Sequence, residues 1–291
     1  MKKFLILLIL TILSISPAYA VKIGLLQDVH KIYFGIATDG QIVDTNLHKQ
    51  IMPISKLTTY EIKAKRDVIQ LRTEDNYKYD IPTDEITIRT VEPNSFICVN
   101  NKWYKGSIHI VRKHNDLTVI NDVGLEDYVK GVIPAEMPSS WSIEALKAQA
   151  IAARSYTIAN LGKRADHGFD LTNTTQDQVY YGVSAETPST NQAVEETEGL
   201  VLTHDNKVIS TIYCSSAGGM TKSAQEVWGG YVPYLQPVRS FDDSTGKRGH
   251  GVGMSQYGAK NLAEMGYNAF QILGYFYTGI HFAKLNPENI N

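Results

Sequence analysis

Residues 142–161 are the feature that most limits how this chain can fold. Ser142 is a good helix N-cap, Glu144 places a negative charge in the first turn, and Gly162 is a good stop signal. Between them the sequence is apolar or small on nearly every helical face, which is typical of a helix enclosed by other elements. We therefore predict a buried central helix.

Three polar side chains on this helix need an explanation. Lys147, Gln149 and Arg154 have little solvent-facing surface available, so each needs a polar partner or a wet cleft. Any one of them alone is most simply a core polar group with a partner. All three together, soon after the carboxylate of Glu136, favour a cleft, and we treat them as candidate substrate contacts.

The segments around this helix predict an α+β protein. Residues 21–103 are short β-prone runs separated by turn residues, with Asp39-Gly40 as an expected hairpin turn. Further helices are expected from a capping box at Ser189–Gln192, from about Ser255 to Gly266, and over Ala269–Tyr277. The predicted fold is antiparallel sheet with a few packed helices, including the buried central one, preceded by a β-rich N-terminal lobe.

The N-terminal residues predict an exported protein. Residues 1–20 read as a signal peptide, with two lysines, an apolar run and a small-residue cleavage site, so export to the periplasm or to the cell wall and outside is expected. No other segment is long and apolar enough to span a membrane. A net charge of −2 gives no indication of nucleic-acid binding. We expect a signal peptide at 1–20, a β-rich lobe at 21–104 and a catalytic domain at 105–291.

Cysteine and histidine usage predicts no metal site. Cys98 and Cys214 lie far apart, and in an exported chain they are either a disulfide or two buried free thiols. The eight histidines show none of the spacings with cysteine or carboxylates that zinc sites use.

Glu136 is the strongest catalytic candidate. It lies in the apolar stretch 132–138 between Pro134 and Pro138, which favour a rigid, extended segment. Burial disfavours the charged form of a carboxyl group and so raises its pKa towards the range of a general acid. The simpler alternative is an exposed carboxylate at the end of a strand.

A glycine-rich stretch, residues 249–258, runs into a helix N-terminus and offers His250, Ser255 and Gln256. It lacks the Lys-Ser or Lys-Thr of a nucleotide loop. It approaches a serine-hydrolase elbow around Ser255, but Tyr257 stands where glycine is needed.

The hydroxyl-rich residues 213–221 add Tyr213 and Ser215 as candidate contacts. Aromatic side chains elsewhere, of the kind that line carbohydrate clefts, are Tyr180, Tyr181, Trp228, Tyr231, Tyr234 and Tyr257.

Four segments in order, 125–137, 145–156, 213–221 and 249–259, resemble the successive motifs of the stage II sporulation protein D family, the SpoIID/LytB domain. The resemblance covers about residues 105–282. It implies a lytic transglycosylase that cuts peptidoglycan glycan strands between N-acetylmuramic acid and N-acetylglucosamine. In that reaction Glu136 is the catalytic acid and then the base, and no cofactor is needed.

The resemblance leaves two alternatives and one departure. A non-enzymatic wall-binding module that enhances a partner amidase, an N-acetylmuramoyl-L-alanine amidase, would keep the cleft without needing the acid. A serine esterase using Ser255 and His250 is a weaker alternative. Zinc-containing members carry a histidine and two cysteines after the central helix, whereas here only His167 matches and residues 170–180 contain no cysteine. We therefore predict no zinc, and the departure also leaves open a role in general wall remodelling instead of sporulation.

Overall fold

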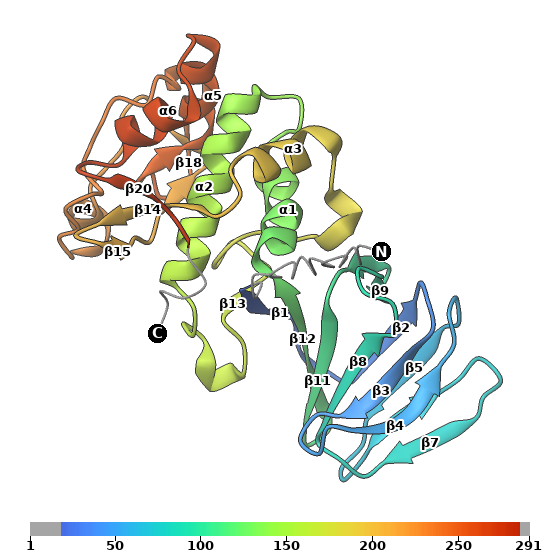
Figure 1. The fold of residues 1–291 in the computed structure, drawn as a ribbon. Helices are drawn as coiled ribbons and strands as arrows, with labels where there is room; N and C mark the ends of the chain where they lie inside the picture. The colour runs from blue at the N-terminus through green and yellow to red at the C-terminus, as the bar shows by residue number, and fades with distance from the viewer. Residues whose placement is uncertain (1–18, 286–291) are drawn as a thin grey trace, which may run out of the picture.

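The computed structural model describes residues 19–285, as a strand-rich part (blue to green in Figure 1) beside a helical part (green to red). Most of the expected signal peptide lies outside the described residues. The expected cleavage point, after Ala20, falls at the first residue of the first strand. None of the helices in the described range has the length and apolar character needed to cross a membrane.

Two antiparallel sheets build the strand-rich part. The first contains, in spatial order, β13 (Leu171–Thr172), β1 (Ala20–Val29), β12 (Asp116–Gly124), β11 (Ser107–Lys113), β8 (Glu85–Thr90), β3 (Gly40–Asp44) and β4 (Lys49–Ile54), with only β13 parallel to its neighbour. The second contains β10 (Lys102–Tyr104), β9 (Ile97–Val99), β2 (Lys31–Ile36), β5 (Tyr60–Ala64), β6 (Ile69–Arg72) and β7 (Lys78–Ile81). Alternate residues are buried along most of these strands, and the inward-facing isoleucines and valines of both sheets belong to one continuous core.

The expected hairpin at Asp39-Gly40 is wrong. β2 and β3 flank this turn but lie in different sheets, so the chain crosses between the sheets there. A type I′ hairpin turn needs positive φ at both central residues, and neither Asp39 nor Gly40 has it. By contrast, Asp205 and Asn206 have φ values of 50° and 61° and join β14 (Leu200–His204) to β15 (Lys207–Val208) as a hairpin.

The central helix is confirmed. α2 (Ile143–Ala159) begins after the N-cap Ser142, and twelve of its seventeen residues are buried. Four helices contact it: α1 (Leu125–Glu136), α3 (Pro188–Glu196), α5 (Gln256–Glu264) and α6 (Ala269–Phe276). Together with the sheets they make an α+β fold with a β-rich N-terminal region, as the sequence predicted.

Local capping decides where these helices begin. α5 starts after Ser255 and α6 after Asn268, close to the expected positions. The capping box of α3 is formed by Thr187 and Thr190, so the box expected at Ser189–Gln192 is wrong by two residues. Pro188 follows Thr187 as the first helical residue, where its missing N–H costs nothing.

Short strands complete the helical part. β20 (His281–Lys284) pairs with β14, β16 (Tyr213–Cys214) runs parallel to β19 (Met254–Ser255), and β17 (Ser216–Ala217) pairs with β18 (Lys247–Arg248). The short helix α4 (Ala224–Trp228) lies between β17 and β18 in the sequence. β11 and β12, which follow residue 104, share a sheet with β1. The domain boundary expected at residue 104 stays a prediction.

Candidate functional site

Glu136 is the last residue of α1, and not part of an extended segment. The helix continues through Pro134 and ends at Met137, which is extended, with φ −129°, and donates its N–H to the carbonyl of Ile133. Pro134 removes only one backbone donor, and the rest of the helix is held by the burial of Tyr128, Val129 and Val132. Pro134 is therefore accommodated inside the helix and Pro138 follows its end, so the expected extended segment is wrong.

The carboxyl group of Glu136 is mostly buried and has two N–H donors. The backbone N–H of Val179 donates to Oε1 at 2.9 Å, and Nε2 of Gln256 donates to Oε2 at 3.1 Å. Among residues 19–285 no lysine, arginine or histidine forms an ion pair with it. Burial raises the pKa of Glu136 above its ordinary value of 4.5, and the two hydrogen bonds oppose that shift. The group is thus suited to hold a proton and then to be stabilised as an anion.

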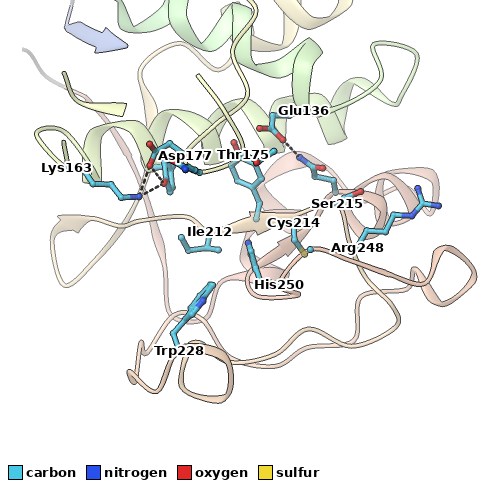
Figure 2. A pocket seen from close by; sticks show the side chains of 15 residues that line it. Glu136, Lys163, Thr175, Asp177, Ile212, Cys214, Ser215, Trp228, Arg248 and His250 are labelled. Atoms are coloured by element: carbon cyan, nitrogen blue, oxygen red, sulfur yellow. Dashed lines mark hydrogen bonds and ion pairs between the residues drawn. The ribbon is translucent and has the colours of Figure 1, made fainter. Parts of the chain in front are cut away.

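A cavity of about 500 Å³ opens in front of Glu136. Figure 2 shows Glu136 at the top of this pocket, His250 below it and Trp228 at the bottom of the view. Its lining comes from α1, α2, the loop before Val179, strand β16, the tip of α4, the glycine-rich stretch and the start of α5. Segments that are distant in the sequence therefore meet around one carboxyl group.

Asp177 fixes the wall of the cavity that carries Val179. Its side chain is fully buried, and it accepts hydrogen bonds from Lys163 Nζ, Arg164 Nε and both donors of Thr172 at 2.7–2.9 Å. Although burial alone would raise it, these donors hold the pKa of Asp177 well below its ordinary value. Asp177 is the other carboxylate that lines the cavity, and two cations already neutralise it.

Gln178 and Tyr213 link this loop to the opposite wall. The hydroxyl of Tyr213 donates to Oε1 of Gln178 at 2.8 Å, and Nε2 of Gln178 donates to the Thr157 hydroxyl on α2 at 2.9 Å. Gln178 is fully buried, so these bonds are shielded from water. Tyr213 thereby lines the cavity in a fixed position.

The glycine-rich stretch brings the start of α5 against Glu136. Gly253 has a φ of 73°, and a Cβ there would lie 1.9 Å from the carbonyl oxygen of Ile212. Only glycine allows this close approach, which places β19 beside β16 and directs Gln256, the first residue of α5, at the carboxyl group. The stretch therefore positions Gln256, and it also supplies His250 to the cavity lining.

His250 lines the cavity but does not contact Glu136. Its Nδ1 accepts the backbone N–H of Val252 at 3.0 Å, and its ring lies 5.2 Å from the ring of Trp228. Burial lowers the pKa of His250 below 6.5, opposed by the backbone carbonyl of Tyr213. The imidazole is therefore neutral near pH 7 and forms an aromatic wall with Trp228, which is 54% exposed and whose ring plane is tilted by 56° from that of His250.

The structure does not bring the polar residues of α2 to the cavity. Arg154 is fully buried, forms a bidentate ion pair with Glu126 and donates to the carbonyl of Leu200. Lys147 pairs with Glu144 and Glu196.

Gln149 is also fully buried away from the cavity lining, and its amide atoms have no hydrogen-bond partner within residues 19–285. None of these three side chains is a substrate contact in this arrangement. The alanine-rich helix left their direction open, because every one of its faces packs against another element.

Ser215 and Tyr213 line the cavity, whereas Ser255 does not. The Ser255 hydroxyl is fully buried, donates to Asp242 at 2.6 Å and accepts the N–H of Gly258 as the N-cap of α5. It makes no contact with His250, so the serine-esterase alternative has no nucleophile–base pair. We assign Ser255 a structural role.

Neither cysteine is in a disulfide. Cys98 lies in β9, and Cys214 lies buried in β16 at the cavity wall. Burial raises the pKa of Cys214 to about 11, so its thiol is protonated at neutral pH and is a poor nucleophile. Within residues 19–285 no three histidine, cysteine or acidic side chains gather as metal ligands, and His167 packs against Phe169.

Sequence reasoning missed Asp177, Asp242 and the backbone N–H of Val179. The two aspartates lie in polar loops without a periodic pattern, and a backbone donor leaves no side-chain signal. Lys163 and Arg248 also line the cavity and were missed as well. The sequence signal at these positions is limited to the many polar side chains of residues 170–178 and 239–243, which are typical of loops.

Part of the chain is similar to known proteins. Residues 113–204 match the SpoIID family, described as stage II sporulation protein. An uncharacterized protein of Brachyspira hyodysenteriae is 43% identical over 141 residues, which are 48% of this chain and 38% of that protein. The amidase enhancer of Bacillus subtilis is 47% identical over 115 residues, 40% of this chain and 15% of the relative.

Stage II sporulation protein D of Bacillus subtilis is 35% identical over 149 residues, 46% of this chain and 43% of the relative. The region that matches the SpoIID family contains α1, α2 and Glu136. The chain spans less than half the length of these three relatives.

Proposed function

We propose that this protein acts on the cell wall as a peptidoglycan lytic transglycosylase with Glu136 as its single acid and base. The observation that carries the proposal is the pair of carboxylates on the cavity wall. Asp177 is neutralised by Lys163 and Arg164, while Glu136 has no cation and a raised pKa. A two-carboxylate glycosidase needs a second carboxyl group that is free to react, in addition to the acid. Among the described residues that line this cavity, Glu136 is the one carboxyl group without a cation.

The reaction uses both protonation states of Glu136. The protonated carboxyl donates its proton to the glycosidic oxygen as the bond from that oxygen to the anomeric carbon of N-acetylmuramic acid breaks. The resulting carboxylate then takes the proton of the 6-hydroxyl of the same sugar, whose oxygen bonds to the anomeric carbon. The products are a free 4-hydroxyl and a 1,6-anhydro end, and no water is consumed.

The two N–H donors support this exchange of roles. Val179 N–H and Gln256 Nε2 each point at one oxygen of the carboxyl group, and they stabilise the anion that forms when the proton leaves. They also hold the carboxyl plane in one orientation, so the same group faces the departing oxygen and the attacking hydroxyl. Burial thus favours the protonated form of Glu136 that starts the reaction, and the two hydrogen bonds favour the carboxylate that acts in its second half.

The remaining cavity residues are proposed to bind the sugar chain. Tyr213 and Ser215 present polar groups beside Glu136, and His250 and Trp228 form the aromatic wall further out. The apolar face of a pyranose ring can pack on such a wall. Lys147, Gln149, Arg154 and Ser255 are left out of the proposed substrate contacts because none of them lines the cavity.

A second candidate function is enhancement of a partner N-acetylmuramoyl-L-alanine amidase. A relative named amidase enhancer is 47% identical over 115 residues of this chain, which favours it. Such a protein would bind glycan strands in the same cavity without needing a protonated Glu136. Both candidates require the chain to reach the wall, and export by residues 1–20 is part of the proposal.

Product analysis separates the two candidates. Purified protein is incubated with glycan strands, with and without stem peptides, in H₂¹⁸O, and the new ends are identified by mass spectrometry. Transglycosylation gives 1,6-anhydro ends without ¹⁸O, and hydrolysis gives reducing ends that contain it. Glu136→Gln should abolish the anhydro ends, and Glu264→Gln, an exposed glutamate of α5, is the matched control.

The same reactions are then repeated with an amidase and peptide-substituted strands. If wild type gives no anhydro ends but accelerates the amidase, and Glu136→Gln accelerates it equally, the enhancer function replaces the proposal. Anhydro ends that persist in Glu136→Gln would instead show that another group is the acid.

A further inference from the structure

Asp242 is a buried carboxylate that the proposed reaction does not use. Its side chain is fully buried, and no ion pair joins it to a lysine, arginine or histidine in the described part of the chain. Instead five donors surround it. Oδ2 accepts from Ser216 Oγ at 2.8 Å, Ala217 N at 2.7 Å and Ser255 Oγ at 2.6 Å, and Oδ1 accepts from Gly219 N at 2.7 Å and from Ser240 Oγ.

These five bonds make Asp242 a rigid junction. Burial alone would raise its pKa, but the donated hydrogen bonds hold the pKa of Asp242 well below its ordinary value. Each of these donors offsets part of the free-energy cost of burying a carboxylate that has no cation beside it. The junction therefore fixes three separate segments to one another: residues 216–219, Ser240 and the N-terminus of α5.

The third of these segments leads to Glu136. Ser255 donates its hydroxyl proton to Asp242 and accepts the N–H of Gly258, so one hydroxyl joins the carboxylate to the first turn of α5. The next residue is Gln256, which is 5% exposed and donates to Oε2 of Glu136. The path from Asp242 to the proposed acid thus runs through one hydroxyl and one helix turn.

We propose that Asp242 is a positioning residue that sets Gln256 against Glu136 by fixing the start of α5. This inference rests on the proposed function only for its effect on turnover. Its structural part concerns the Gln256–Glu136 hydrogen bond, which exists whether or not the protein is an enzyme.

Three substitutions test the path. Asp242→Asn keeps the shape but replaces one acceptor oxygen with an NH₂ group, which faces donors on either side. Ser255→Ala removes only the link from Asp242 to α5. Ser216→Ala is the matched control, because the Ser216 hydroxyl donates to the same oxygen, Oδ2, but forms no hydrogen bond with α5.

The readout is the titration of the Glu136 carboxyl carbon, followed by ¹³C NMR with labelled glutamate and assigned by comparison with Glu136→Gln. The hydrogen bond from Gln256 lowers the pKa of Glu136, so its loss should raise that pKa. Titratable or charged groups that line the cavity or face Glu136 are Tyr128, Tyr156, Lys163, Asp177, Tyr213, Cys214, Arg248 and His250. Ser255→Ala and Ser216→Ala leave these residues and every charge unchanged, so a shift of the Glu136 pKa in Ser255→Ala alone reports on α5.

The expected result is an upward shift in Asp242→Asn and Ser255→Ala that matches Gln256→Ala, with no shift in Ser216→Ala. Adding Asp242→Asn to Gln256→Ala should give no further shift. Where anhydro ends form, turnover should fall about ten- to a hundredfold with a smaller change in KM, because the acid is misplaced and the sugar contacts remain.

The proposal is overturned if Glu136 titrates as in wild type in Ser255→Ala, or if Ser216→Ala shifts it equally. Should Asp242→Asn fail to fold, Ser255→Ala against Ser216→Ala still decides the matter. A shift without any turnover in wild type would retain Asp242 as a positioning residue and reject the transglycosylase.

Discussion

The two ends of α1 carry glutamates in opposite environments. At the first turn Glu126 forms two hydrogen bonds to the Arg154 guanidinium, at 2.8 and 2.7 Å, and accepts the N–H of Gly199. At the last residue Glu136 has two neutral N–H donors and no cation, and burial raises its pKa. One helix therefore holds an ion-paired carboxylate at its first turn and a carboxyl group with a raised pKa at its last residue.

The difference shows that the partner, and not the burial alone, decides the role of a carboxyl group. A guanidinium matches both oxygens of Glu126 and fixes α1 to the central helix. Neutral donors orient Glu136 without neutralising it, so the desolvation of its charged form remains. Helix polarity acts in the same sense, since the N-terminus of a helix favours a negative charge and the C-terminus disfavours it.

The largest effect should come from the C-terminal glutamate. Glu136→Gln removes the proton donor while keeping shape and burial, and the formation of anhydro ends should fall about 10²- to 10⁴-fold. Initial rates by mass spectrometry measure it, with Glu264→Gln as the control for loss of one negative charge. A variant that keeps more than about a tenth of the wild-type rate contradicts the chemical role given to this end of α1.

The N-terminal glutamate should matter for stability. Glu126→Gln leaves the guanidinium of Arg154 buried without its charge partner, and the free energy of unfolding should drop by about 2–3 kcal/mol, since Glu126 itself is partly exposed. Denaturant unfolding measures this loss. Lys130→Ala on the same helix removes an exposed pair with Glu195 and should cost less than about 1 kcal/mol. If both variants lost the same free energy of unfolding, the Glu126–Arg154 pair would not have the stabilising role given to it here.

Stability against pH offers a sharper version of the comparison. Above its ordinary value of 4.5 the unfolded Glu136 releases its proton while the folded chain still binds it, so stability falls as the pH rises towards the raised pKa. Glu136→Gln cannot ionise and avoids that loss.

The variant should therefore be more stable than wild type at pH 7, by about 1.4 kcal/mol for each unit by which the pKa is raised. The gain should disappear below about pH 4, where both states of Glu136 are protonated. Thermal melting across pH checks it, and a variant that is less stable than wild type at pH 7 and equal at pH 4 argues against a raised pKa.

The smallest effect should come from the wall of the cavity furthest from α1. Trp228→Ala removes a packing surface for a sugar ring, so KM should rise about three- to tenfold with kcat nearly unchanged. Tyr231→Ala is the control, because Tyr231 is exposed but does not line the cavity. A fall in kcat alone would assign Trp228 to the chemistry and extend the reacting site beyond Glu136.

Local sequence patterns predicted much of the helical part. Ser142, Ser255 and the alanine-rich stretch between residues 143 and 156 specify α2 and the start of α5 through capping and burial, which depend on neighbours along the chain. Glu136 was chosen because it is a lone carboxylate in an apolar stretch, and the structure buries its carboxyl group beside two N–H donors. The turn at Asp39-Gly40 failed because the choice of partner strand depends on distant residues of two sheets.

The rest of the site depends on contacts between distant segments. Arg154 was expected in the cleft, but its partner Glu126 lies 28 positions earlier and no local rule pairs them. Asp177 and Asp242 lie in loops, and their hydrogen-bond donors come from several segments that are distant in the sequence. Their role is therefore visible only in the folded structure. The direction of a buried polar side chain was the hardest feature to predict.

Direct titration of Glu136 tests the central claim. The carboxyl carbons of ¹³C-labelled glutamate are followed from pH 3 to 9, and the signal absent from Glu136→Gln identifies the group. A carboxyl group that stays protonated above its ordinary pKa of 4.5, because it is buried without a cation, is the result this account predicts. A Glu136 that ionises at or below that value would contradict it.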